Sequence, residues 1–263
     1  MNLTFVSIAL LLAVGAGLST AAGFIFNSAG LLLVLGAAVP YPIWLQQVIR
    51  KRYNSALGWV LFWAVCQSLA IAVATVLAPE QAAKVVFSGT DYTAEMFHWI
   101  RTGEGAEGSL ALFLPIHLKH YALFCLLSLV TLGSAALLMG TWLLNYMNFY
   151  VAQLVMASTK PGLAAAIAWP PWSLLRVVGF IATGIALTSL GLALIRRIQQ
   201  GLSHTNAQSS TTPVTWKTAA QKIWETDRGT IRYLLLGLEL VAADIVVKAA
   251  IAPVWQKLLL STL

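Results

Sequence analysis

Residues 4–49 form an almost unbroken apolar run. Crossing a bilayer takes about 20 consecutive apolar residues in a helix, because every backbone N–H and C=O must find its partner within the segment. The run is too long for one span and fits two, with Asn27 and Ser28 as the best turn. Other apolar stretches of similar length follow, without the alternating pattern of an outer-membrane barrel. The sequence therefore predicts an all-α, polytopic transmembrane helical bundle, with residues 1–263 as one integral membrane domain.

Charge supports the same class of protein. Only 10% of the residues are charged, against roughly 25% in soluble domains. The net charge of +7 comes from short basic clusters beside apolar spans, such as 50–52 and 196–197, which is typical of cytoplasmic loops. We therefore expect the lipid bilayer as a partner and no nucleic acid. Cys66 and Cys125 lie in apolar stretches and are interpreted as small core residues.

The loops give the expected topology. No Lys or Arg precedes Arg50, so the first apolar run is interpreted as a retained span and not as a signal peptide. Residues 79–108 hold five acidic side chains and are predicted to be an outer loop with a short interfacial helix. Residues 198–229 are polar and basic and are predicted to be a cytoplasmic loop. The N-terminus is then cytoplasmic, in the inner membrane of a cell.

Residues 109–158 have two interpretations. Two spans that meet near Gly133-Ser134 give about seven spans and place all the basic clusters on one side. One long helix after an interfacial piece gives six spans and places 196–197 on the wrong side, so seven is preferred. The last span is expected over about 231–251, stopped by Pro253.

Two sets of polar residues lie in or beside the spans, where each is a functional candidate because polar groups are costly in lipid. Glu107, His117 and His120 could bind a metal ion, since the histidines share a helix face, or could hold a proton near a quinone. Alternatively, the histidines lie at the outer interface and reach water.

The second set lies in the last span and consists of Arg232, Glu239, Asp244 and Lys248. Asp244 and Lys248 are four residues apart and could pair along one helix face. Glu239 and Asp244 could line a path for protons or cations. Alternatively, these acids bond to a neighbouring helix and fix packing or oligomerisation.

The segment Arg232-Tyr-Leu-Leu-Leu-Gly-Leu-Glu239, with Ala242-Ala-Asp244-Ile and Ile251-Ala-Pro253 after it, resembles a small family of bacterial membrane proteins of unknown function. The resemblance covers roughly the last third of the chain. It implies a helix that ends in a basic cluster, followed by the helix that carries this motif, and it implies no activity.

These features leave three hypotheses for function. The first is a transporter or channel component for a small solute or ion, and the second is a redox, quinone-binding or metal-binding membrane component. The third is a non-catalytic accessory subunit, as a homo-oligomer or within a larger membrane complex. The sequence assigns no catalytic residue and no cofactor, so enzymatic activity stays open.

Overall fold

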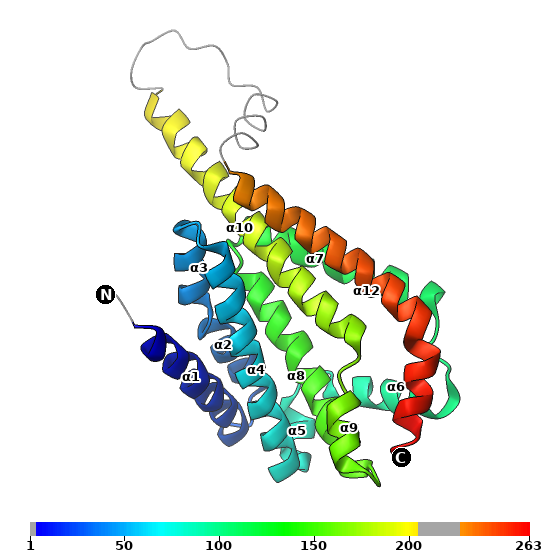
Figure 1. Ribbon diagram of the computed structural model, residues 1–263. Helices are drawn as coiled ribbons and strands as arrows, with labels where there is room; N and C mark the ends of the chain where they lie inside the picture. Colours follow the sequence, from blue (N-terminus) through cyan, green and yellow to red (C-terminus); the bar gives the residue numbers. More distant parts are fainter. Residues whose placement is uncertain (1–3, 205–226) are drawn as a thin grey trace.

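The computed structural model describes residues 4–204 and 227–263, and this part of the chain forms helices and no strand. The all-α prediction is thus confirmed. In Figure 1 the long helices lie side by side as a bundle. The helices are α1 (Phe5–Ile25), α2 (Ala29–Ala38), α3 (Tyr41–Ile49), α4 (Tyr53–Leu77), α5 (Pro79–Val85), α6 (Gly89–Thr102), α7 (Leu110–Val130), α8 (Ser134–Ala157), α9 (Pro161–Ile167), α10 (Pro171–His204) and α12 (Arg228–Leu260).

The first apolar run folds as two antiparallel segments. Asn27 at the turn has a left-handed φ of 49°, a conformation that asparagine adopts more readily than most residues. Ser28 then caps α2, because its hydroxyl accepts a hydrogen bond from the Leu31 N–H at 3.2 Å. Pro40 separates α2 from α3. The predicted turn at Asn27 and Ser28 is confirmed.

Residues 109–158 fold as two helices, and the interpretation as one long helix is wrong. Gly133, between α7 and α8, has a φ of 85°, which favours glycine. The turn is also crowded, since a Cβ at Gly133 would lie 2.8 Å from Trp44 Nε1 and 2.8 Å from Thr188 Oγ1. The weak turn signal in the sequence therefore marks a tight contact with other helices.

Five helical segments of the described chain are long and apolar enough to cross a membrane, as expected of a multi-pass membrane protein. They are Phe5–Ile25, Ala29–Ile49, Tyr53–Leu77, Leu110–Val130 and Pro171–Arg197. Helices α8 and α12 have 24 and 33 residues but carry more polar side chains. Large apolar side chains are exposed on the outer faces of α1 and α4, including Leu18 at 65% and Leu69 at 62%.

The last helix continues past the expected stop at Pro253 and ends at Leu260. A proline inside a helix removes one backbone hydrogen bond, but contacts to other elements hold the last turns. The Trp255 indole N–H donates to the Ile167 carbonyl at 3.1 Å, and the Gln256 amide donates to the Ile100 carbonyl. Prediction of this boundary failed because these contacts come from distant parts of the chain.

Helices α10 and α12 pack closely where two glycines meet. A Cβ at Gly237 would clash with Thr183, whose backbone N would be 2.8 Å away, and would lie 3.0 Å from the Gly179 carbonyl oxygen. Small residues allow helix backbones to approach in this way. The pairing fixes which face of α12 points into the bundle.

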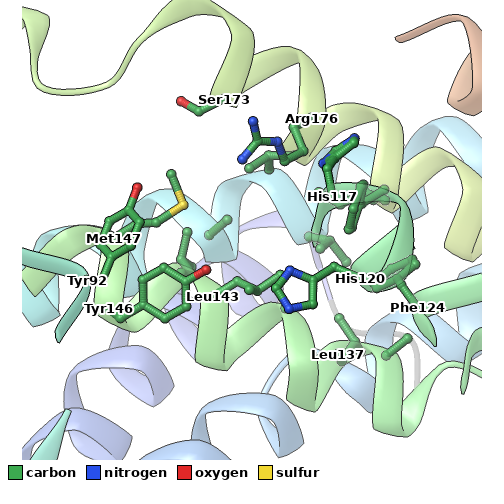
Figure 2. A pocket seen from close by; sticks show the side chains of 18 of the residues that line it. Tyr92, His117, His120, Phe124, Leu137, Leu143, Tyr146, Met147, Ser173 and Arg176 are labelled. Atoms are coloured by element: carbon green, nitrogen blue, oxygen red, sulfur yellow. The ribbon is translucent and has the colours of Figure 1, made fainter. Parts of the chain in front are cut away.

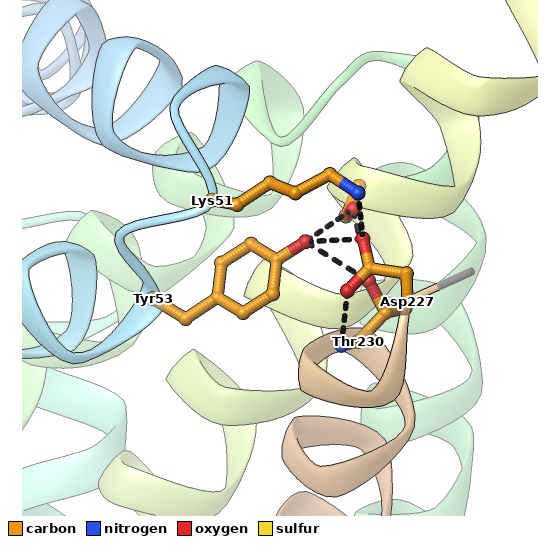
Figure 3. Close-up of polar contacts among 5 residues, drawn as sticks. Lys51, Tyr53, Asp227 and Thr230 are labelled. Carbon is orange, nitrogen blue, oxygen red and sulfur yellow. Dashed lines mark hydrogen bonds and ion pairs between the residues drawn. The ribbon is translucent and has the colours of Figure 1, made fainter. Parts of the chain in front are cut away.

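A polar cluster ties the start of α12 to the turn before α4 (Figure 3). Lys51 Nζ lies 3.1 Å from Asp227 Oδ2, and the Tyr53 hydroxyl donates to the same oxygen at 2.9 Å. Asp227 also caps α12 by accepting the Thr230 N–H at 3.1 Å. Helix α10 extends to His204, so the predicted loop over 198–229 is helical at its start, while residues 205–226 lie outside the described residues.

Candidate functional site: an intramembrane cavity with an ionic end

A cavity of about 250 Å³ lies between α3, α4, α7, α8 and α10, with α6 and the loop at 103–108 beside one end. Figure 2 shows side chains that line it, among them Arg176, His117, His120, Tyr92 and Tyr146. The lining extends along α8 from Gly133 to Met147, and at about 1.5 Å of rise per residue this stretch is about 21 Å long. The cavity is therefore elongated along the bundle.

The body of the cavity is apolar and aromatic. The side chains there come from α3, α4, α7, α8 and α10 and include Trp44, Trp63, Phe124, Leu137 and Ile181. Trp44 and Trp63 are 2% and 3% exposed, and among the described residues their indole N–H groups have no hydrogen-bond partner. Buried N–H groups usually have a hydrogen-bond partner. An oxygen atom of a molecule bound in the cavity could accept hydrogen bonds from these two indoles.

At the other end, Asp244 is the centre of a buried ionic cluster. Arg176 donates to both carboxylate oxygens, from Nε at 3.0 Å and from Nη2 at 3.1 Å. This paired geometry is the strong form of the arginine–carboxylate contact. His117 Nε2 lies 3.3 Å from Asp244 Oδ2, although the contact is not aligned as a hydrogen bond. Asp244 is fully buried, and it joins α7, α10 and α12.

A second ion pair closes the cluster beneath the 103–108 loop. Lys248 Nζ lies 2.9 Å from Glu107 Oε2 and 3.2 Å from the centre of the Phe113 ring. The Arg176 guanidinium lies 4.9 Å from the same ring centre, and His117 stacks on the ring at 5.0 Å. Both cations thus lie over the Phe113 ring, whose π-electrons stabilise positive charge.

Helix periodicity explains why these side chains meet. Along α12 the residues that face the bundle recur every three or four positions, which is the spacing of one helix face; they are Tyr233, Gly237, Val241, Asp244, Lys248 and Ala252. Along α7 the buried residues Phe113, His117 and Phe124 follow the same rule. The glycine contact between α10 and α12 sets the rotation of α12 that brings Asp244 to Arg176.

The cluster balances two basic side chains, Arg176 and Lys248, against two acidic ones, Asp244 and Glu107. A guanidinium has five N–H donors, and two of those on Arg176 are used by Asp244, which leaves donors for the cavity that it lines. On α6, burial raises the pKa of the Glu95 carboxyl, and the nearby Glu107 carboxylate raises it further. Burial also raises the pKa of the Tyr92 phenol well above its ordinary value.

The structure brings together some residues of the two predicted sets but not all of them. Glu107 and His117 from the first set lie with Asp244 and Lys248 from the second, and His120 lines the same cavity. Asp244 and Lys248 find their ion-pair partners on other elements and not in each other, because both point into the bundle. The described residues hold no group of three or more His, Cys, Asp or Glu that could bind a metal ion.

Arg232 and Glu239 lie elsewhere. Both are exposed on the outer side of α12 and neither lines the cavity. Glu239 is therefore not placed beside Asp244 as a second step of a proton or cation path. Five residues along a helix correspond to a rotation of about 140°, so the two acids face different surroundings.

Sequence reasoning missed Arg176, the residue that holds the cluster together. Its signal was present, because a lone arginine near the start of an apolar span is a functional candidate by default. It also missed Trp63, for which the sequence offers no comparable signal, since aromatic residues are common in spans. No protein-family model, curated protein or solved structure matches the chain.

Proposed function

We propose that the chain crosses the membrane seven times, through the five apolar segments together with α8 and α12. The charges at the two ends of the bundle support this count. The end that holds the α3–α4 turn and the start of α12 carries a basic group, namely Arg50, Lys51, Arg52, Arg196, Arg197 and Arg228, whereas α5, α6 and the following loop at the other end carry Glu80, Asp91, Glu95, Glu104 and Glu107. The positive-inside rule then makes the basic end and the N-terminus cytoplasmic.

Within that bundle we propose that the protein binds a neutral, lipid-soluble molecule with carbonyl or hydroxyl oxygens, such as an isoprenoid quinone. The observation that supports this most is the form of the cavity, which is about 21 Å long, with an apolar body and one polar end. Arg176 and His120 offer donors to an oxygen of the head group, while Trp44 and Trp63 offer N–H groups in the apolar part. The balanced charge of the cluster favours a neutral head group over a phosphate or carboxylate.

The two histidines add polar groups to the lining. Both His117 and His120 line the cavity, and a neutral imidazole carries one N–H donor and one acceptor nitrogen, so each ring can form a hydrogen bond with such a head group. Redox turnover of a quinone would need an electron donor or acceptor from another protein, which is consistent with a redox component of a larger membrane complex.

Thermal stabilisation by ligand tests this proposal. The purified protein in lipid nanodiscs would be heated with a decyl-substituted benzoquinone, with decane and with decyl phosphate. At 100 times the dissociation constant, a bound ligand stabilises by about 2.7 kcal/mol, so the quinone should raise Tm and the other two should not. Equal shifts with all three compounds would contradict a site for a neutral, oxygen-bearing head group.

Glycine variants make the test specific to the cavity. A Cβ at Gly140 meets nothing within 4 Å, and Gly140 lines the cavity, so Gly140→Leu should fill it and abolish the shift. Gly58 is the matched control, because a Cβ there also meets nothing within 4 Å while the residue is exposed on α4. If Gly140→Leu keeps the full shift, the ligand does not bind in this cavity.

Transport of such a molecule is the second candidate. The cavity covers about 21 Å of a hydrocarbon layer of about 30 Å, and the tight Gly133–Trp44 contact lies at one end. A site that approaches one side and is closed from the other is what alternating access requires. Quinone-loaded vesicles would show protein-dependent release under this candidate and retention under simple binding.

A further inference from the structure

The outward face of α12 combines apolar side chains with one carboxylate. Val246 is 67% exposed, and Leu235 and Leu238 are 50% and 47% exposed. Glu239 and Ala242 are exposed between them. Large exposed apolar surface is expected where lipid is the solvent, but an acidic group in its middle is not. The face therefore differs from that of α1, whose exposed large side chains are apolar.

The depth of Glu239 makes this placement costly. If α12 crosses the membrane as proposed, Arg232 lies near the cytoplasmic interface, and Glu239 lies seven residues further along the helix. At about 1.5 Å per residue this is roughly 10 Å deeper, well inside a hydrocarbon half-layer of about 15 Å. Among the described residues, none forms an ion pair or hydrogen bond with the Glu239 side chain.

We propose that this face of α12 docks onto a transmembrane helix of a partner protein, and that the partner presents a lysine or arginine at the depth of Glu239. Ionisable groups within membranes normally face protein or water and pair with one another, so the partner's cation supplies what the chain itself lacks. Ala242, one turn from Glu239, is small enough to allow close approach of the second helix. The proposal rests on the membrane-crossing arrangement of α12 given above.

A second copy of this chain fits the face less well. Copies related by a two-fold axis along the membrane normal would bring identical residues to the same depth, so Glu239 would meet Glu239 of the copy. Two carboxylates at one site repel each other. A partner helix with a basic group at that depth has no such conflict, and its charge complements that of this face.

Defined peptides in nanodiscs test the docking. The probe is a synthetic transmembrane helix of leucine and alanine with a single central lysine, labelled for energy transfer to a labelled full-length protein. The matched peptide carries leucine in place of lysine. The lysine peptide should bind wild type at least tenfold more tightly than the leucine peptide, and Glu239→Leu should remove that difference.

Charge reversal gives the sharper result. Glu239→Lys should bind the lysine peptide more weakly than wild type does, and it should bind a peptide with a central glutamate more tightly. The reason is that the substitution reverses the sign of the charge on this face. Equal binding of the lysine peptide to wild type and Glu239→Leu would overturn the proposal. Energy transfer between differently labelled copies that is lost in Glu239→Leu would also overturn it, by making a second copy the occupant.

The same samples separate this proposal from the proposed ligand. Glu239 does not line the cavity, so Glu239→Leu should leave the stabilisation by decyl benzoquinone unchanged. Failure of the peptide test with intact quinone binding would reject the docking face alone. Loss of quinone stabilisation in Glu239→Leu would contradict the separation of the two sites.

Discussion

Removal of the Asp244 carboxylate is the most direct test of the ionic cluster. Asp244→Leu would leave the Arg176 guanidinium without its paired acceptor and His117 without its neighbour. Removing one partner of a buried ion pair costs about 3–5 kcal/mol, because the remaining charge stays buried without compensation. Asp244 is fully buried, but the Arg176 side chain is 20% exposed, so the lower end of that range, about 3 kcal/mol, is expected.

The assay is thermal unfolding of the purified protein in detergent micelles, followed by the helical signal in circular dichroism. For a chain of this size, 1 kcal/mol corresponds to about 2–4 °C in Tm, so a loss of about 3 kcal/mol predicts a fall of roughly 6–12 °C. Glu239→Leu is the matched control, because it removes an acid from the same helix at an exposed position. It should not lower Tm, because it leaves no buried charge without a partner and removes an acid that is costly where lipid is the solvent.

The double variant decides whether the pair is the cause. Replacing both Asp244 and Arg176 by leucine removes both charges together, and such replacements are often neutral or stabilising. The double variant should therefore be more stable than Asp244→Leu alone. If Asp244→Leu behaves like Glu239→Leu, or if the two changes simply add, the cluster does not have the energetic role that its geometry implies.

Two further predictions concern packing and pH. Gly237→Ala should destabilise the protein by about 1–3 kcal/mol, because its Cβ would lie 2.8 Å from Thr183 N. Gly58→Ala is the control and should change stability little, because a Cβ there meets nothing within 4 Å. Tm measurements compare the two variants. Although burial acts to raise it, hydrogen bonds from Thr230, Tyr53 and Lys51 lower the pKa of Asp227. The Asp227 carboxyl of the unfolded chain therefore binds a proton at higher pH than that of the folded chain. The stabilisation present at neutral pH is lost as pH falls below about 4, the ordinary pKa of Asp. Asp227→Asn should remove this part of the acid sensitivity of Tm.

The elements of the fold that depend on local chain properties could be predicted. The apolar run at 4–49 requires two helices and a turn, because backbone groups in lipid must be paired within each segment, and the structure has that turn at Asn27. The end of α12 could not be predicted. Proline at 253 normally disfavours a continuing helix, and only the distant contact of Trp255 with Ile167 shows why this helix continues.

The sequence could predict which ionisable residues belong to the candidate site, but not which of them form ion pairs with one another. The sequence singled out Glu107, His117, Asp244 and Lys248 because ionisable groups are rare in spans. It divided them into two sets, since the groups lie more than 100 residues apart along the chain. Their meeting depends on the rotation of α12 against α10, which is set by the contact of Gly237 with Gly179.

The cost of the cluster is itself an argument for function. Two acids and two bases lie between membrane helices, although apolar residues of similar volume would often give an equally or more stable protein. Stability alone therefore does not explain the presence of these four charged side chains. The charged groups adjoin the polar end of an elongated cavity, and Arg176 keeps N–H donors beyond those that Asp244 accepts. Asp244 thus holds Arg176 beside the cavity, and the proposed role of this ion pair is to orient the remaining N–H donors of Arg176 toward a ligand.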